Sequence, residues 1–235
     1  MNRKRTGPRS GPRTHDIPLT RAAVLAAALE IIDDRGVDQL SMRRLGEALG
    51  RDPMAIYRHT SNKAAVLDGV VEVVLEHLTV DASDPDWRHQ LRLIARDFRH
   101  TALTHPKTVP LLVTRPLATP LGLRPIGTLR PVERILRLLI DAEFSGADAL
   151  RIYRALFGFL YGHVLTELQE IVELPEESTD LLRLGLHRLP IDEFPLLRGL
   201  ATDLTTYDGA AELEHGLDIL LTGLTATLSP PCAEP

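Results

Sequence analysis

A short basic segment between residues 51 and 63 carries side chains of the types that bind phosphate. It holds Arg51, Arg58, His59 and Lys63 around one aromatic side chain, Tyr57. Guanidinium and ammonium groups pair with phosphate oxygens, and a guanidinium can also bond to the edge of a guanine. These residues therefore favour contact with a nucleic acid.

The same segment predicts a short helix that stands away from the protein core. Asp52 can cap a helix over about residues 53–60. Pro53 fits the first turn of this helix, where a backbone N–H would have no partner within the helix. A helix that begins at Ser41 precedes it, and two helices joined by a tight turn form a helix-turn-helix unit. Ile56 would anchor the second helix, which must be slim to enter a major groove about 12 Å wide.

The outward residues of this unit would contact bases and phosphates. Met54 and Ala55 could touch a thymine methyl, and the N-terminus of the following helix adds backbone donors beside Lys63. A helical corner in an ordinary bundle is the alternative, because helix–turn–helix patterns are common by chance. Our predicted DNA contacts are Ser41, Arg43, Arg44, Arg51, Met54, Ala55, Tyr57, Arg58, His59 and Lys63.

Charge is unevenly distributed along the chain. The net charge of −5 combines a local +5 over residues 1–64 with a local −10 over the remainder. The first 15 residues contain five basic residues and no acidic one, within a Gly-, Pro- and Arg-rich stretch to residue 19 that we expect to be a flexible arm. A basic front favours a polyanionic partner for that part alone, although a solvated tail would carry the same charges.

Helical periodicity dominates the rest of the sequence, which shows no sustained strand alternation and no fixed-period repeat. Thr20 can cap the first helix, and Gly36 should end it in the left-handed conformation. Six prolines between residues 106 and 131 leave room for short helical pieces only. The acidic, proline-interrupted residues 175–195 predict a loop with room for one helical turn. We expect an all-α fold with further helices over 61–78, 86–104, 128–142, 145–172 and 209–228.

A known family is similar to residues 20–70. The N-terminal DNA-binding domain of the TetR family of one-component transcriptional repressors resembles TRAAVLAAALEIIDDRGVDQLSMRRLGEALGRDPMAIYRHTSNKAAVLDGV. Residue types and spacing agree over three helices, notably at Gly36, Ser41-Met42-Arg43-Arg44-Leu45, Leu49-Gly50, Ile56-Tyr57-Arg58-His59, Lys63 and Leu67. The sequence departs from the family pattern at three positions: Arg51 replaces a small apolar residue, Asp52 a Ser or Thr, and Thr60 a Phe or Val.

The resemblance implies how the chain is divided. A basic arm (1–19) precedes a helix-turn-helix domain (20–65), a connecting helix (66–80) and a ligand-binding and dimerisation domain (81–235). Beyond residue 80, the order of helices is similar to the regulatory domain of the branch that includes the tetracycline repressor. Family members of this kind bind a small molecule and then dissociate from an operator. The resemblance therefore implies a repressor that a small-molecule effector releases from double-stranded DNA.

Two long helices of the body have more apolar surface than one neighbour would cover. The helix over 145–172 has two apolar faces, and the last helix has a leucine stripe from Leu213 to Leu228. Pairing with the same two helices of a second copy would form a four-helix bundle and would space two reading helices for DNA half-sites. A monomeric core is the alternative, and the resemblance favours a homodimer.

The prolines also predict an effector cavity between Phe98 and Tyr161, because they prevent regular helix pairing. His100, His105 and His163 could suggest a metal ion, but no two of them are three or four residues apart. We predict neither a metal nor a cofactor, and any one of the cavity residues could instead be ordinary core or surface. Our predicted effector contacts are Phe98, His100, Leu111, Leu112, Arg115, Leu139, Phe157 and Tyr161.

Other classes of protein have less support. The sequence lacks the Gly-x-Ser-x-Gly and His-Glu-x-x-His motifs of enzymes, and its single cysteine, Cys232, is three residues from the end. An architectural DNA-binding protein that senses nothing would not need a large apolar body. No apolar run approaches the roughly 18 residues that suggest a membrane span, and no signal peptide is visible, so we expect a cytoplasmic protein.

Overall fold

The computed structural model describes residues 18–81, 83–118, 120–170, 184–204 and 206–228, which contain helices and no strand. The all-α prediction is therefore confirmed. In chain order, the helical elements with assigned labels are α1 (Arg21–Arg35), η1 (Val37–Gln39), α2 (Met42–Leu49), α3 (Pro53–Ile56), α4 (Lys63–Leu75), α5 (Trp87–Thr104), η2 (Pro106–Thr108), α6 (Val109–Ala118), η3 (Leu121–Leu123), α7 (Ile126–Asp141), α8 (Gly146–Glu170), α10 (Pro195–Gly199), α11 (Ala201–Leu204) and α12 (Gly209–Leu228).

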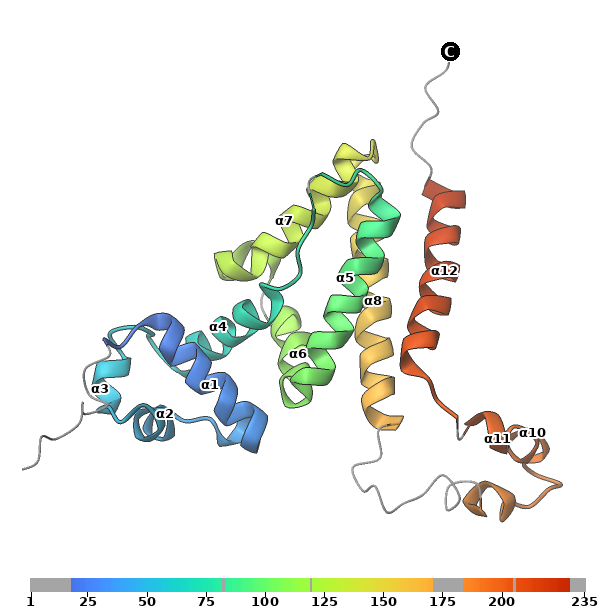
Figure 1. Ribbon diagram of the computed structural model, residues 1–235, viewed down its shortest axis with the longest axis horizontal. Coiled ribbons are helices and arrows are strands. Elements are labelled where there is room, and N and C mark those ends of the chain that lie inside the picture. Colours follow the sequence, from blue (N-terminus) through green and yellow to red (C-terminus); the bar gives the residue numbers. More distant parts are fainter. Residues whose placement is uncertain (1–17, 82, 119, 171–183, 205, 229–235) are drawn as a thin grey trace, which may run out of the picture.

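The first four α-helices form a head at one end of the molecule, and α5 to α12 form the body (Figure 1). Each head helix begins at a side-chain cap: Thr20, Ser41, Asp52 and Asn62 accept a hydrogen bond from a backbone N–H two or three residues further on. These caps satisfy donors that have no partner inside the helix, and they fix where each helix starts.

Gly36 ends α1, but not in the predicted left-handed conformation. Its φ is positive, as expected, at 85°, whereas its ψ of 165° is extended. This region of backbone space is open almost only to glycine, because a Cβ atom would clash with the backbone. The chain therefore turns directly from α1 into η1 instead of closing with a helical cap.

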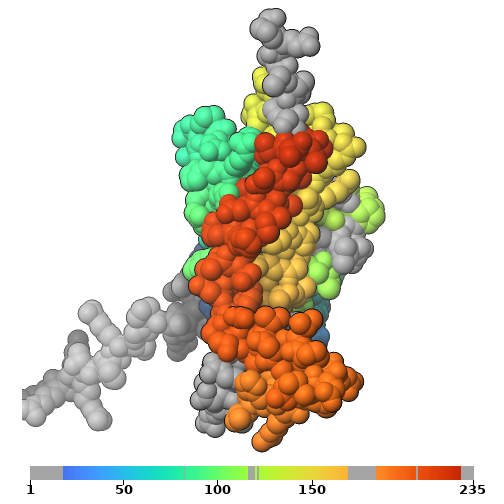
Figure 2. All heavy atoms as spheres, turned by 90° about the vertical axis from the view of Figure 1, so that its right-hand side faces the viewer, coloured from blue at the N-terminus to red at the C-terminus, as the bar shows by residue number. Residues whose placement is uncertain are grey.

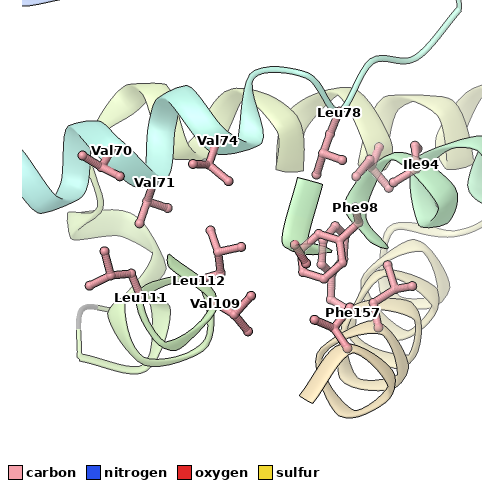
Figure 3. Packing of buried hydrophobic residues seen from close by; sticks show 14 of the residues in the cluster. Val70, Val71, Val74, Leu78, Ile94, Phe98, Val109, Leu111, Leu112 and Phe157 are labelled. Carbon is pink, nitrogen blue, oxygen red and sulfur yellow. The ribbon is translucent and has the colours of Figure 1, made fainter. Parts of the chain in front are cut away.

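In the body, α5, α8 and α12 run side by side, while α6 and α7 lie between them and α4 (Figure 1). Val70, Val71 and Val74 of α4 face Leu111 and Leu112 of α6 across a buried apolar layer (Figure 3). The buried core continues from there to Phe98 and Phe157, so head and body share one apolar interior.

The proline-rich region behaves as predicted in its first part and differs in its second. Residues 106–123 form only short pieces, of which α6 is the longest with 10 residues. The next helix begins at Ile126 rather than 128, since Pro125 occupies its N-cap, and Pro131 consequently lies inside the helix instead of in its first turn. Pro131 has no N–H, so it cannot donate the usual bond to the carbonyl of Gly127.

In the C-terminal third, one helix has its predicted bounds and the predicted loop is partly helical. The last helix, Gly209–Leu228, has the predicted bounds. Of the predicted loop, residues 175–183 lie outside the described residues, as do 171–174, residues 1–17 of the arm and Cys232. Pro195 opens α10, because proline is well suited to a first helical position. None of the described helices is long and apolar enough to cross a membrane.

Ion pairs join the three long body helices. On α5, Arg92 Nη2 lies 2.5 Å from Oδ1 of Asp218 on α12. Arg96 Nε lies 2.6 Å from Oε1 of Glu214 on the same helix. Arg99 donates from Nε to Oε2 of Glu167 on α8 over 2.8 Å, and the Glu167 side chain is only 5% exposed. A buried carboxylate needs such a partner, so this pair constrains how α5 and α8 can pack.

His163 is buried beside that pair and should make stability depend on pH. Burial is the largest influence on this ring and lowers its pKa below the ordinary 6.5, although Glu167 opposes the effect. Below about pH 6.5 the unfolded chain therefore binds more protons than the folded chain, and the free energy of unfolding falls as the pH drops. We expect His163→Gln to show a smaller loss of stability between about pH 7 and pH 5 than the parent protein.

Urea unfolding at several pH values would measure this difference, with the exposed His215→Gln as a control on α12. A pH dependence in His163→Gln that equals the parent's would contradict the assignment.

Candidate DNA-binding head and effector cavity

The helix α3 lies at the outer edge of the head, remote from α8 and α12 (Figure 1). Ile56 is fully buried beneath it, whereas Met54 on its other side is 70% exposed. The backbone keeps turning after Ile56, where His59 N donates to Ile56 O over 2.9 Å, so the protruding segment extends to about the predicted residue 60. It is thus anchored through Ile56 and exposed to solvent at Met54, Tyr57 and Arg58.

A tight turn sets the angle between α2 and α3. Arg51 N donates to Gly46 O over 2.9 Å, and Gly50 ends α2 in the left-handed conformation. A Cβ atom on Gly46 would lie 2.8 Å from the Arg51 carbonyl oxygen, closer than real Cβ contacts allow. Only glycine at position 46 lets the two helices approach in this way.

The predicted DNA contacts gather on and around this unit with different degrees of exposure. Arg43 is 82% exposed and lies 3.7 Å from Glu47, while the Arg44 guanidinium turns back to donate to Gln39 Oε1 over 2.8 Å. Arg44 therefore stabilises the turn between η1 and α2. The exposed members of the set are Ser41, Arg43, Met54, Tyr57 and Arg58, and the half-buried ones are Arg44, Arg51, Ala55, His59 and Lys63.

The body contains a cavity at the junction of α4, α6, α7 and α8. It encloses about 40 Å³ of free space, enough for a few water molecules. Three aromatic side chains of α8, spaced four residues apart, belong to its wall. The described lining residues are Asp68, Val71, Leu75, Leu78, Arg115, Arg124, Pro125, Thr128, Pro131, Val132, Tyr153, Phe157 and Tyr161.

Three of the eight predicted effector contacts line this cavity: Arg115, Phe157 and Tyr161. Phe98 lies directly behind the wall, with its ring centroid 6.0 Å from that of Phe157 and 5.6 Å from that of Tyr161.

The other four predicted contacts lie elsewhere. Leu111 and Leu112 are buried in the layer beneath α4, and Leu139 is fully buried core (Figure 3). Their apolar character reflects helix packing, which the sequence pattern does not distinguish from a cavity wall. His100 is exposed in a separate surface depression, together with His77 and His105. The described residues contain no cluster of histidine, cysteine and carboxylate side chains that could hold a metal ion.

Sequence reasoning missed the cavity residues that α4 and the start of α7 supply. Val71 and Leu75 are apolar residues of α4, and their residue types do not indicate whether they border a cavity or another helix. Pro125 and Pro131 were part of the proline-rich signal, and both line this cavity.

The polar groups of the cavity are one carboxylate, two guanidiniums, two phenols and the hydroxyl of Thr128. Arg115 donates from Nε to Asp68 Oδ1 over 2.8 Å and also contacts Ala64 O at 3.1 Å, which joins α6 to α4. Burial raises the pKa of Tyr161 to about 12 and raises that of Tyr153, while the nearby positive charge of Arg124 opposes both shifts. Both phenols are therefore neutral hydrogen-bond donors at physiological pH.

Comparison with known proteins agrees with both halves of this architecture. Residues 24–70 match the family described as bacterial regulatory proteins, tetR family, and residues 81–228 match the tetracyclin repressor-like C-terminal domain. The chain belongs to the TetR family. It is a ligand-responsive DNA-binding transcriptional regulator and not an enzyme.

Individual relatives of this TetR-family regulator cover most of its length. The tetracycline repressor protein class C of Escherichia coli is 32% identical over 88% of this chain and 90% of its own length. An HTH-type transcriptional regulator of Saccharopolyspora erythraea is 30% identical over 89% of this chain and 86% of its own. Among solved structures, ActR of Streptomyces coelicolor in complex with actinorhodin superimposes with a TM-score of 0.73 at 29% identity, covering 89% of this chain and 98% of that one.

The contrast between the two sides of α3 generates a paired prediction. Ile56→Ala should lower the free energy of unfolding by about 2–5 kcal/mol, because it leaves a cavity under α3. Met54→Ala, two residues away on the exposed side, should change stability by no more than about 0.5 kcal/mol. Thermal or denaturant unfolding of both variants measures the difference. Equal losses would show that α3 is not anchored through Ile56.

Proposed function

We propose that this TetR-family regulator is a homodimeric repressor whose head binds operator DNA and whose cavity binds the effector that releases it. The observation that carries the proposal is the protruding α3, held from below by the fully buried Ile56 and open to solvent at Met54. A repressor acts where its operator lies, so we place the protein in the bacterial cytoplasm.

In the proposed complex, α3 enters the major groove and the surrounding residues bind its walls. Met54 and Ala55 supply apolar contacts to base edges, and Arg58 supplies a guanidinium. Tyr57 and Lys63 lie beside the groove walls, where a phenol and an ammonium group bind phosphate. Ser41, Arg43, Arg44, Arg51 and His59 complete the proposed contact set around them.

Dimerisation would use the face on which α8 and α12 lie together (Figure 2). Leu213, Leu217 and Leu221 point into the chain's own core, whereas Ile219 is 64% exposed and Leu165 of α8 is 39% exposed. A second copy would cover these outward side chains and form a four-helix bundle from two α8 and two α12 helices. The two-fold axis would then present two α3 helices to successive half-sites.

The effector would act by moving α4, because that helix forms one wall of the cavity. Asp68, Val71 and Leu75 of α4 all line it. The free space of about 40 Å³ is small for an effector, so we expect a wall to move when one binds. Since α4 also packs on α1, its displacement changes the position of the head. The effector then shifts the protein toward a state whose two heads no longer match the operator.

A second contact joins the same cavity to the head through α7. Glu72 of α4 pairs with Arg21 of α1 at 2.7 Å, and the same carboxyl group packs on Gly127. A Cβ atom at Gly127 would lie only 1.8 Å from Glu72 Cδ. Pro125 and Thr128 flank Gly127 and line the cavity, so movement of this turn would reach the N-terminus of α1.

The relatives support a small-molecule effector. One solved neighbour, ActR, is in complex with actinorhodin, and the class C relative is named as a tetracycline repressor protein. The two names differ in the molecule concerned, so they support the ligand-sensing role of the body rather than one particular effector.

A mobility-shift assay on the DNA upstream of the protein's own gene tests the proposal. We expect tight, salt-sensitive binding that Tyr57→Ala and Lys63→Ala each weaken. Lys63→Ala should also lower the slope of log affinity against log salt by about 1, because one phosphate contact is lost. Arg137→Ala, an exposed basic residue of α7, serves as a control and should bind as the parent does. Unchanged binding in both head variants would contradict the proposal.

The contact between Gly127 and Glu72 yields a further prediction. Gly127→Ala should displace the Glu72 side chain, break its pair with Arg21 and weaken operator binding about twofold to fivefold, the effect of one partly exposed ion pair. Glu72→Gln should weaken binding equally, and the double variant should add nothing.

Gly122→Ala is the matched control, because a Cβ atom there meets nothing within 4 Å. If Gly127→Ala bound the operator as Gly122→Ala does, the link through α7 would be wrong.

A further inference from the structure

The side chains of the cavity define a class of ligand, and this inference rests on the effector role proposed above. We propose that the effector is an aromatic molecule with an acidic group. Its rings would pack on Tyr153, Phe157 and Tyr161, and its carboxylate or acidic phenol would face Arg124.

The aromatic wall is a continuous ladder along α8. The ring centroids of Tyr153 and Phe157 are 4.8 Å apart, and those of Phe157 and Tyr161 are 5.9 Å apart. Phe98 of α5 supports the ladder from behind in edge-to-face contacts. Aromatic rings gain free energy from offset or edge contacts with other rings beyond the area that they bury. A ligand that enters this cavity therefore gains most if it presents rings to the ladder.

The charges of the described lining residues favour an anion. Asp68 is the carboxylate among them, and its Oδ1 already accepts from Arg115. Arg124 adds a second guanidinium, which leaves these residues with a formal charge of +1. A guanidinium is well matched to a carboxylate, because it can donate two parallel hydrogen bonds.

Neutral donors reinforce this preference. Tyr153 and Tyr161 both lie within the electrostatic influence of Arg124, and their buried phenols keep their protons. A phenol O–H can donate to a carboxylate or a quinone-like carbonyl oxygen. A cationic ligand would instead have to take Asp68 from Arg115, which would leave that guanidinium without its carboxylate.

Isothermal titration calorimetry on the full chain at about pH 7.5 tests this class of ligand with three bicyclic probes of similar size. The probes are 2-naphthoate, its neutral methyl ester and the cationic 2-naphthylmethylamine. We expect the acid to bind about tenfold or more tightly than either of the others, the effect of one hydrogen bond to a charged group.

Variants of Arg124 separate charge from shape. Arg124→Met should abolish the preference for the acid while the ester binds as before, whereas Arg124→Lys should keep much of it, because the positive charge remains. Arg154→Met, an exposed arginine on α8 that is absent from the cavity wall, is the matched control and should keep the full preference. Circular dichroism of each variant confirms that it is folded.

The outcomes distinguish this inference from the proposed function. Equal binding of acid and ester, tighter binding of the amine, a preference that survives Arg124→Met, or no binding of any probe at about 1 mM would each overturn the ligand class. None of these results affects operator binding, which the mobility-shift assay measures without a ligand. Loss of operator binding in that assay would overturn the proposed function whatever the calorimetry shows.

Discussion

One helix, α4, packs on both halves of the molecule, and this shared packing is the constraint on which the rest depends. Toward the head, α4 lies so close to α1 that a Cβ atom at Gly69 would be 2.5 Å from a methyl carbon of Leu25. Toward the body, it contacts α6 and α7 and supplies part of the cavity wall. Close-packed interfaces of this kind change between discrete arrangements rather than deform gradually. The head cannot keep its position if the wall changes.

The opposite wall of the cavity is held differently. Helix α8 is joined to α5 by the buried pair of Arg99 and Glu167, and α5 is joined to α12 by Arg92 and Arg96. Glu167 is 5% exposed, so removing its partner would leave a carboxylate charge without compensation in the interior. The pair between Arg21 and Glu72, by contrast, is partly exposed and weaker. The pair between Arg115 and Asp68, which joins α6 to α4, is also more exposed than Glu167. In the proposed mechanism, movement of α4 would therefore break weaker pairs than movement of α8.

Local sequence signals predicted the helix starts because each cap is a property of one residue and its next turn. Thr20, Ser41 and Asp52 act where their residue type indicated. The conformation of Gly36 could not be predicted in the same way, because the path from α1 into η1 depends on where α2 packs.

The cavity was predictable as a region but not as a list of residues. Prolines between 106 and 131 marked the place where helices fail to close, and the aromatic residues of α8 pointed to one wall. Leu111, Leu112 and Leu139 have the same apolar character as true wall residues, and only the packing of α6 and α7 places them in the core. Asp68 was not predicted because its partner Arg115 is 47 residues away, and no local pattern reports such a distance.

Under the proposed function, the small free volume of the cavity has a thermodynamic consequence for how effector and DNA binding influence each other. Part of the effector's intrinsic affinity would be spent on opening the walls, so its apparent affinity would be reduced in proportion to the fraction of molecules that are open. Linkage makes this effect reciprocal. DNA that favours the closed arrangement lowers the affinity for the effector by the same factor by which the effector lowers the affinity for DNA. In this proposal, the cost of opening the cavity sets the effector concentration above which the protein leaves its operator.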